Sequence, residues 1–218
     1  MICVSLGLPS VAECLRVLPA VEFAEIRLDL MKVEPADVPA LFACGKRLIA
    51  ACRPGTKSRS LRKALLLASI RSGAAFVDIE HDADARYRDS LLGEARKARS
   101  LVILSFHDYA GLPPLGALER LVRKCFRFGA DYVKVACWTD TPAQAARLLG
   151  ILGSPLANGR LIVVGLGRSG PQVRVFAPFL GSPFTYASLG RGMETAPGQL
   201  PVASLAGAQR RLSSLFRE

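Results

Sequence analysis

A lysine lies in the middle of an apolar stretch of the chain. Lys134 stands between Val133 and Val135, in a run over residues 131–137 that has the composition of a buried strand. Burial and neighbouring cations disfavour the ammonium form of a lysine, so such a side chain can react as a free amine. A free amine attacks a ketone to form an imine, which acidifies the neighbouring carbon. Lys134 is therefore a candidate nucleophile for Schiff-base chemistry.

A histidine and several arginines complete a chemical set around this lysine. His107 closes the preceding apolar run, and an imidazole can remove a proton next to an imine and later protonate a leaving group. Arg27, Arg53 and Arg174 are candidates for holding an anion or hydroxyl groups. These residue types favour a lyase or aldolase that acts through a Schiff base on a small hydroxylated keto acid.

The elements that must position these residues alternate along the chain. Stretches with helical spacing separate eight short β-branched or apolar runs, at residues 2–6, 23–29, 47–53, 76–80, 101–107, 131–137, 161–166 and 184–188. Eight strands that are each followed by a helix predict an α/β protein, a (βα)8 TIM barrel forming a single domain over residues 1–218. The alternative is an open doubly wound sheet, which would need a glycine-rich phosphate turn after an early strand. The Gly165-Leu166-Gly167 segment comes late and matches that turn poorly.

Two of the predicted strands carry charged residues at alternating positions. Glu25, Arg27 and Asp29 would share one face of the second strand, and Asp78 and Glu80 would share one face of the fourth. Charged groups inside a barrel are costly unless they are paired or used in function. A structural ion network explains them as well as a binding site does.

Composition narrows the class of protein further. The chain has 29 Lys and Arg against 18 Asp and Glu, a formal net charge of +11, which favours an anionic partner. Its six cysteines form no C-x-x-C pair and it has only two histidines, so we expect no metal site. The first basic residue is Arg16, which argues against a signal peptide, and no apolar run is long enough to span a membrane. We expect a cytoplasmic protein with reduced thiols.

The chain resembles the type I 3-dehydroquinate dehydratase family over nearly its whole length. Each fragment of the resemblance is short, but their order and spacing around one barrel are specific. The matching segments are residues 25–29 (EIRLD), 52–53 (CR), 78–80 (DIE), 105–109 (SFHDY), 129–136 (GADYVKVA), 181–186 (GSPFTY) and 196–199 (APGQ).

The resemblance implies a syn elimination of water from 3-dehydroquinate to give 3-dehydroshikimate, in the shikimate pathway of aromatic amino acid biosynthesis. Lys134 would condense with the C3 ketone, while His107 would take the C2 proton and pass one to the departing C1 hydroxyl. Arg174 would bind the carboxylate from the loop after strand seven. The other substrate contacts that the resemblance implies are Ser5, Glu25, Arg27, Arg53, Thr195 and Gln199.

The resemblance implies no metal and no organic cofactor, because the lysine itself is the electron sink. The expected partner is a small anionic substrate, with no nucleic acid or membrane, and a homodimer is the candidate assembly. The chain departs from the family at two places. Thr195 stands where the family often has serine, which keeps the hydroxyl, and Lys57 stands where some members have a glutamate beside the catalytic histidine. A cation at that place favours the neutral imidazole.

Two alternatives remain open from the sequence. One is a class I aldolase, similar to a transaldolase, that would use the same lysine on sugar phosphates and hold the phosphate in residues 165–170 (GLGRSG). The other is a basic barrel without catalysis that binds nucleic acid through two clusters of cations on predicted helices. The clusters are Lys57, Arg59, Arg62 and Lys63, and Arg120, Arg123, Lys124 and Arg127. Without interleaved aromatic residues, we interpret both as solvated helix faces.

Overall fold

The computed structural model describes residues 1–215, and the chain divides into two compact units. The first unit comprises residues 5–105 and 129–131, and the second comprises residues 1–4, 106–128 and the chain from 132 onward. The expected single domain over residues 1–218 remains a prediction, and its last three residues lie outside the described part of the chain.

Eight strands alternate with helices along the chain, as the sequence predicts. The strands are β1 (Ile2–Leu6), β2 (Phe23–Arg27), β3 (Arg47–Ala51), β4 (Phe76–Glu80), β5 (Leu101–Asp108), β6 (Tyr132–Trp138), β7 (Leu161–Leu166) and β8 (Thr185–Ser188). The main helices are α1 (Val11–Val17), α2 (Val38–Phe42), α3 (Arg59–Arg71), α4 (Ala85–Ala98), α5 (Leu115–Arg127), α6 (Pro142–Leu149), α7 (Gly170–Phe176) and α8 (Val202–Leu215). The strand order in the sheet is β7-β6-β5-β4-β3-β2-β1-β8. The predicted fold class, a (βα)8 TIM barrel, is confirmed.

The predicted strand bounds hold for β1, β4 and β7 and shift by one or two residues elsewhere. The earlier end of β2 changes the interpretation of Asp29. The second strand ends at Arg27, and Asp29 lies in a short 3-10 helix, Leu28–Leu30. The prediction that Asp29 shares a strand face with Glu25 and Arg27 is therefore wrong. The chain turns there because the Arg27 guanidinium folds back onto the Asp29 carboxylate.

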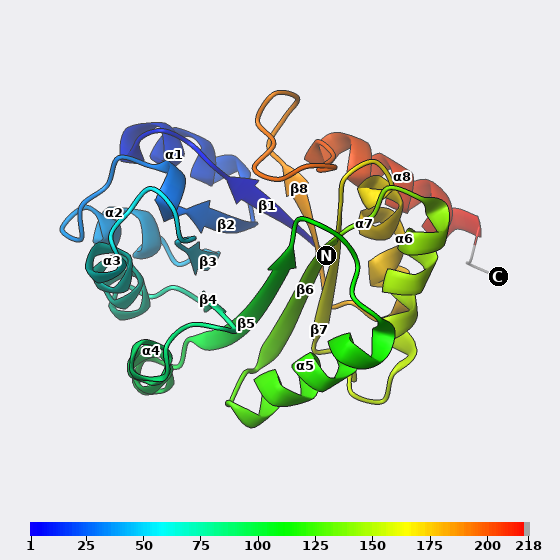
Figure 1. Ribbon diagram of the computed structural model, residues 1–218. Helices are drawn as coiled ribbons and strands as arrows, with labels where there is room; N and C mark the ends of the chain where they lie inside the picture. Colours follow the sequence, from blue (N-terminus) through cyan, green and yellow to red (C-terminus); the bar gives the residue numbers. More distant parts are fainter. Residues whose placement is uncertain (216–218) are drawn as a thin grey trace. The chain divides into compact units, whose positions relative to one another are not determined.

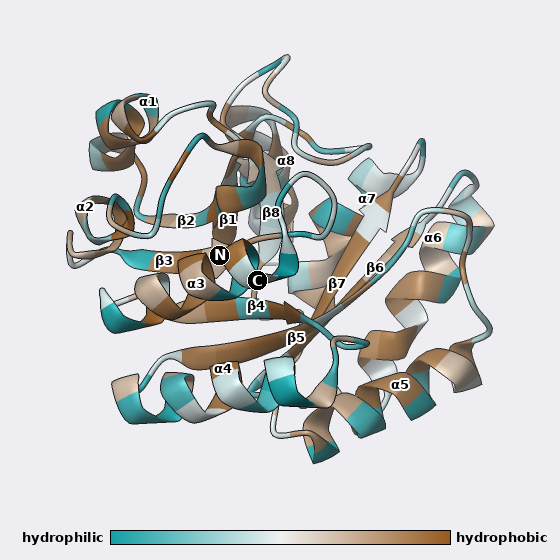
Figure 2. Ribbon diagram, turned by 60° about the vertical axis from the view of Figure 1, so that its left-hand side comes forward, coloured by the Kyte–Doolittle hydropathy of each residue, from teal (hydrophilic) through white to brown (hydrophobic). Residues whose placement is uncertain are grey.

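In the first unit, apolar strands pack beneath amphipathic helices. Figure 1 shows α3 and α4 along one side of β3 and β4. Helix α3 begins at an N-cap, Ser58, whose hydroxyl accepts the backbone N–H of Leu61, and it buries Leu65 and Ile70. The strands of this unit are coloured largely hydrophobic in Figure 2, while α4 combines hydrophilic residues with the buried Tyr87, Leu91, Leu92 and Ala95. Burial of these faces fixes the strand ends that carry the polar residues.

The second unit is built on β6 and β7, which pair in parallel from Val133 opposite Leu161 to Trp138 opposite Leu166. Helices α5, α6 and α7 lie along one side of these strands (Figure 1). Helix α6 begins with a capping box in which the Thr141 hydroxyl accepts the Gln144 backbone N–H and the Gln144 side chain accepts in return. The Gly153 to Gly159 segment lies outside every strand and α-helix, as its composition predicts.

None of the helices in residues 1–215 is both long and apolar enough to cross a membrane. Across the same residues, no group of three or more His, Cys, Asp or Glu side chains has the arrangement of a metal site. All six cysteines are present as thiols. Burial raises the pKa of both Cys52 and Cys137 to about 12, so these two thiols stay protonated and act as small apolar groups.

Candidate active site

Lys134 is a buried residue of β6 in the second unit. Its side chain is only 4% exposed, and the flanking Val133 and Val135 are completely buried. The Nζ atom lies 4.6 Å from the centre of the Tyr186 ring, which comes from β8. The amine is therefore buried beside an aromatic ring, and its burial agrees with the prediction from the sequence.

Tyr186 also connects this lysine to the predicted carboxylate-binding arginine. The Arg174 guanidinium donates from Nη1 to the backbone carbonyl of Tyr186 at 3.2 Å, and Arg174 is only 1% exposed. The expectation that Arg174 lies in the loop after strand seven is wrong, because α7 begins at Gly170 and includes it. Pro171 at the start of that helix has a backbone suited to a first turn, so the helix follows β7 closely.

His107 is the penultimate residue of β5, the strand next to β6 in the sheet order. Its half-buried ring is nearly parallel to the ring of Tyr109, with 6.2 Å between the ring centres. The following loop is fixed by Asp108, whose carboxylate accepts the backbone N–H groups of Ala110 and Gly111. The carbonyl of Gly111 then accepts the backbone N–H of Trp138, at the end of β6. Backbone hydrogen bonds therefore tie the loop after the histidine to the strand that carries the lysine.

The loop after β8 carries two predicted substrate contacts, Thr195 and Gln199. The Gln199 side-chain carbonyl accepts the backbone N–H of Thr195 at 2.8 Å and its hydroxyl at 3.3 Å. Gly198 has a φ of +73°, and its Cα faces the backbone of Gly167 so closely that a Cβ there would collide with the Gly167 carbonyl oxygen. The conformation of this loop thus depends on a glycine-to-glycine contact with the loop after β7.

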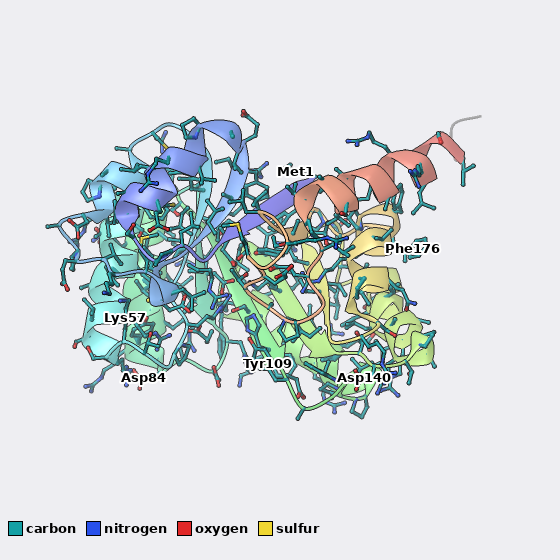
Figure 3. The ribbon with its side chains drawn as sticks, turned by 90° about the horizontal axis from the view of Figure 1, so that it is seen from above. Met1, Lys57, Asp84, Tyr109, Asp140 and Phe176 are labelled. Atoms are coloured by element: carbon teal, nitrogen blue, oxygen red, sulfur yellow. The ribbon has the colours of Figure 1, made fainter. Side chains whose placement is uncertain are left out.

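The glycine-rich segment after β7 does not present a phosphate cradle. Its backbone N–H groups are already used within the unit: that of Ser169 donates to the Thr139 carbonyl, and that of Gly170 donates to the Gly167 carbonyl. The Arg168 N–H points at the Asp140 carboxylate, at 3.5 Å. Figure 3 labels Asp140 on the loop after β6. A carboxylate beside these N–H groups repels a phosphate, so the segment serves packing.

In the first unit, the predicted contacts are paired with acidic groups. The Ser5 hydroxyl donates to the buried Glu25 carboxylate at 3.0 Å. The Arg27 guanidinium binds both carboxylate oxygens of Asp29, at 3.0 and 2.7 Å. Burial alone would raise the pKa of Asp29, but the hydrogen bonds and charge of Arg27 outweigh it and lower that pKa. Asp29 thereby fixes the orientation of Arg27.

Arg53 lies two residues beyond β3 at the centre of an ion network. It donates to Asp78 at 2.5 Å, to Ser105 at 2.7 Å and to Glu80 at 3.1 Å. Burial by itself lowers the pKa of a guanidinium, but the charges of Asp78, Glu80 and Glu25 outweigh it, so the pKa of Arg53 lies well above its usual value. The parallel register that pairs Glu80 with Ser105 brings these acceptors together.

The two basic clusters differ in how far their side chains are exposed to solvent. In α5, Arg120, Arg123, Lys124 and Arg127 are exposed, as expected of a solvated helix face. In α3, the interpretation of Arg62 as part of a solvated face is wrong, because Arg62 is buried and bonded to Glu80. Sequence reasoning missed a role for Arg62 and for Tyr186. Arginines in helices and tyrosines in strands are common, so no sequence signal marks these two residues. Only their burial in the structure sets them apart from other residues of the same type.

Eight βα units, with a buried lysine in β6, a histidine near the end of β5 and a buried arginine in α7, define a (βα)8 barrel with the residue types of an enzyme site. The family model described as Type I 3-dehydroquinase matches residues 2–214, and the chain belongs to that family. Its members are hydro-lyases, so the chain is a lyase.

Individual relatives agree with this assignment. A 3-dehydroquinate dehydratase of Methanosarcina mazei is 31% identical over 83% of this chain and 81% of the relative. One of Dehalococcoides mccartyi is 30% identical over 93% of this chain and 91% of the relative. The crystal structure of 3-dehydroquinate dehydratase from Geobacillus kaustophilus shares the fold, with a TM-score of 0.86, 22% identity, and coverage of 99% of this chain and 92% of that chain.

The depressed pKa of Asp29 makes a prediction about stability in acid. Since this pKa is lower in the folded protein than in the unfolded chain, the ion pair with Arg27 stabilises the fold above about pH 4 and is lost as the pH falls through the folded pKa. Urea unfolding between about pH 5 and pH 3 should therefore show a steeper loss of stability for wild type than for Asp29→Asn. Asp89→Asn, which removes an exposed partner of Arg88, is the control and should keep the wild-type slope. Equal slopes for wild type and Asp29→Asn would contradict the assignment.

The contact between Gly198 and Gly167 predicts that an added side chain destabilises the protein more at Gly198 than elsewhere in the same loop. Gly198→Ala should lower the free energy of unfolding by about 2 kcal/mol more than Gly192→Ala. Gly192 lies in the same loop with a similar φ of +75°, but a Cβ there meets nothing within 4 Å. Both variants strain the backbone, but only Gly198→Ala also causes a collision. The difference between the two variants therefore measures the cost of the collision. Chemical denaturation measures both, and equal costs would mean that the contact is unimportant.

Proposed function

We propose that the chain catalyses the dehydration of 3-dehydroquinate to 3-dehydroshikimate through a Schiff base at Lys134. The observation that carries the proposal is the burial of the Lys134 amine in β6, over the Tyr186 ring, in a member of the type I 3-dehydroquinase family. An amine kept from bulk water has less hydration to lose when it attacks a carbonyl. The relatives' name supplies the substrate.

The steps balance with water as the only by-product. The free-base form of the Lys134 amine adds to the C3 ketone, and loss of water with a proton delivered by His107 forms the iminium. His107 removes a proton from C2, and the electron pair of that C–H bond moves toward the iminium nitrogen to give an enamine. The enamine expels the C1 hydroxyl, which leaves as water with the proton returned by His107. Hydrolysis of the new iminium consumes one water, releases the conjugated ketone, returns one proton to His107 and restores the free amine of the lysine.

The remaining residues are proposed to bind the substrate. Arg174 would take the carboxylate, since a guanidinium matches a carboxylate in geometry and charge. Gln199 and Thr195 would contact the substrate from the loop after β8. The ring hydroxyls would be bound by Glu25, Arg27 and Arg53, with Ser5 as a further contact. Asp29 and the Asp78–Glu80 pair hold two of these arginines in fixed orientations, which reduces the entropy lost on binding.

The competing interpretations receive less support. An aldolase for sugar phosphates needs a phosphate site, but the N–H groups after β7 face Asp140 or are bonded to carbonyls. Binding of nucleic acid through α3 would need Arg62 at the surface, where it is not. The net charge of +11 fits the steering of a small anionic substrate. Action in the shikimate pathway, a cytoplasmic location and assembly as a homodimer remain predictions from the sequence.

Replacement of the lysine tests the proposed nucleophile. Lys134→Ala should lower kcat for the formation of 3-dehydroshikimate by roughly 1000-fold or more, because the covalent route is lost. The product's ultraviolet absorbance measures the rate. Lys97→Ala, which removes an exposed lysine of α4, is the control and should keep wild-type turnover. If Lys134→Ala retained most of its activity, another group would be the nucleophile.

Replacement of the histidine separates imine formation from proton transfer. His107→Ala should lower kcat by about 100-fold to 10 000-fold while Lys134 still forms a covalent adduct with substrate. Mass spectrometry of the intact variant, after incubation with 3-dehydroquinate, should show a protein heavier by the bound ligand. Turnover close to that of wild type would exclude an acid–base role for His107.

A further inference from the structure

Arg62 reaches from α3 to the network that holds Arg53. It is 8% exposed, and its Nε donates to the backbone carbonyl of Cys52 at 2.8 Å. Its Nη2 donates to one oxygen of the Glu80 carboxylate at 2.8 Å, while the other oxygen accepts from Arg53. One guanidinium therefore binds both the residue before Arg53 and the carboxylate that Arg53 contacts.

The surroundings keep Arg62 in this one orientation. Its guanidinium carbon lies 5.8 Å from the centre of the buried Tyr87 ring, within cation–π range. The two hydrogen bonds leave from different nitrogens of a planar group, so they fix its plane as well as its position. A pocket of about 250 Å³, lined by Arg62, Glu80 and Tyr87 among others, adjoins this group. Water could enter there if the side chain were shortened.

Each oxygen of the Glu80 carboxylate accepts from a different arginine, so the orientations of Arg53 and Arg62 are coupled. Without Arg62, Glu80 would keep a single arginine partner and could rotate toward the pocket. The carbonyl of Cys52 would lose its side-chain donor at the same time. Both changes act on Arg53, since one alters an acceptor of its guanidinium and the other loosens the backbone before it. The Asp78 and Ser105 contacts would remain.

We propose that Arg62 is a positioning residue that fixes the Arg53 guanidinium for substrate binding, through Glu80 and the Cys52 carbonyl. The inference rests on the proposed function, in which Arg53 contacts a ring hydroxyl of the substrate. Arg62 itself touches no substrate. Its effect is therefore expected in KM more than in kcat, and only while Arg53 is present.

Steady-state kinetics with 3-dehydroquinate test this role on the full chain. Arg62→Met should raise KM by about 10-fold with kcat within about 3-fold of wild type, because binding is weakened and the lysine chemistry is untouched. Arg62→Lys, which can bond one of the two acceptors, should recover part of the loss. The control is Arg71→Met, on the same helix, which removes an ion pair with Glu94 remote from Arg53 and should leave KM unchanged.

A double-mutant cycle distinguishes positioning from general stability. In an Arg53→Lys background, Arg62→Met should change kcat/KM by less than about 2-fold, because the group that it positions is already absent. An undiminished 10-fold effect in that background, or no difference between Arg62→Met and Arg71→Met in the wild-type background, would overturn the inference. Failure of the proposed function has a different signature, since the wild-type protein itself would then not convert 3-dehydroquinate. Thermal unfolding of each variant confirms that the folded protein is being assayed.

Discussion

The chain depends on one electrostatic constraint: a charge that is buried within a strand must be paired inside the protein. In the first unit, arginines are paired with carboxylates, and Glu80 binds two arginines at once. Asp29 holds Arg27, and Asp78 and Glu80 hold Arg53, while Arg62 closes the network from α3. An ion network and a binding site were alternative explanations of these residues, and the structure makes them compatible. Arginines whose planes are held by carboxylates lose less entropy on binding, which would favour the recognition of a hydroxylated substrate that we propose.

Lys134 is also buried in its strand, and its amine lies 4.6 Å from the centre of the Tyr186 ring. In the proposed reaction this amine attacks the substrate carbonyl and then carries charge as an iminium. Arg174 binds the backbone of the same tyrosine, and the loop that follows His107 is bonded to the end of β6. The proposed reaction uses residues of β5, β6 and α7 in the second unit. Contacts of Tyr186 in β8 and of Trp138 in β6 connect these elements.

Periodicity alone predicted the eight strands and the burial of Lys134, because both follow from local apolar patterns. It failed where a side chain redirects the backbone. Asp29 continues the alternation of Glu25 and Arg27 in the sequence, but its ion pair with Arg27 favours a 3-10 turn instead. Arg62 fits a solvated face by composition, and only the long-range position of Glu80 explains its burial. The glycine-rich segment after β7 resembles a phosphate loop by composition, but the N–H donors that such a loop would offer are used within the fold. The burial of Arg62 comes from a tertiary interaction that no local pattern encodes, whereas the Arg27–Asp29 pair is close in sequence and competes with continuation of the strand.

The central claim is that the amine of Lys134 forms a covalent bond with the substrate. The most direct test is to incubate the wild-type protein with 3-dehydroquinate and borohydride, digest it, and locate the added mass by peptide sequencing in a mass spectrometer. We expect a single reduced adduct on the peptide that contains Lys134, formed only when substrate and borohydride are both present. An adduct on a different lysine, or turnover of substrate with no adduct at all, would contradict this claim.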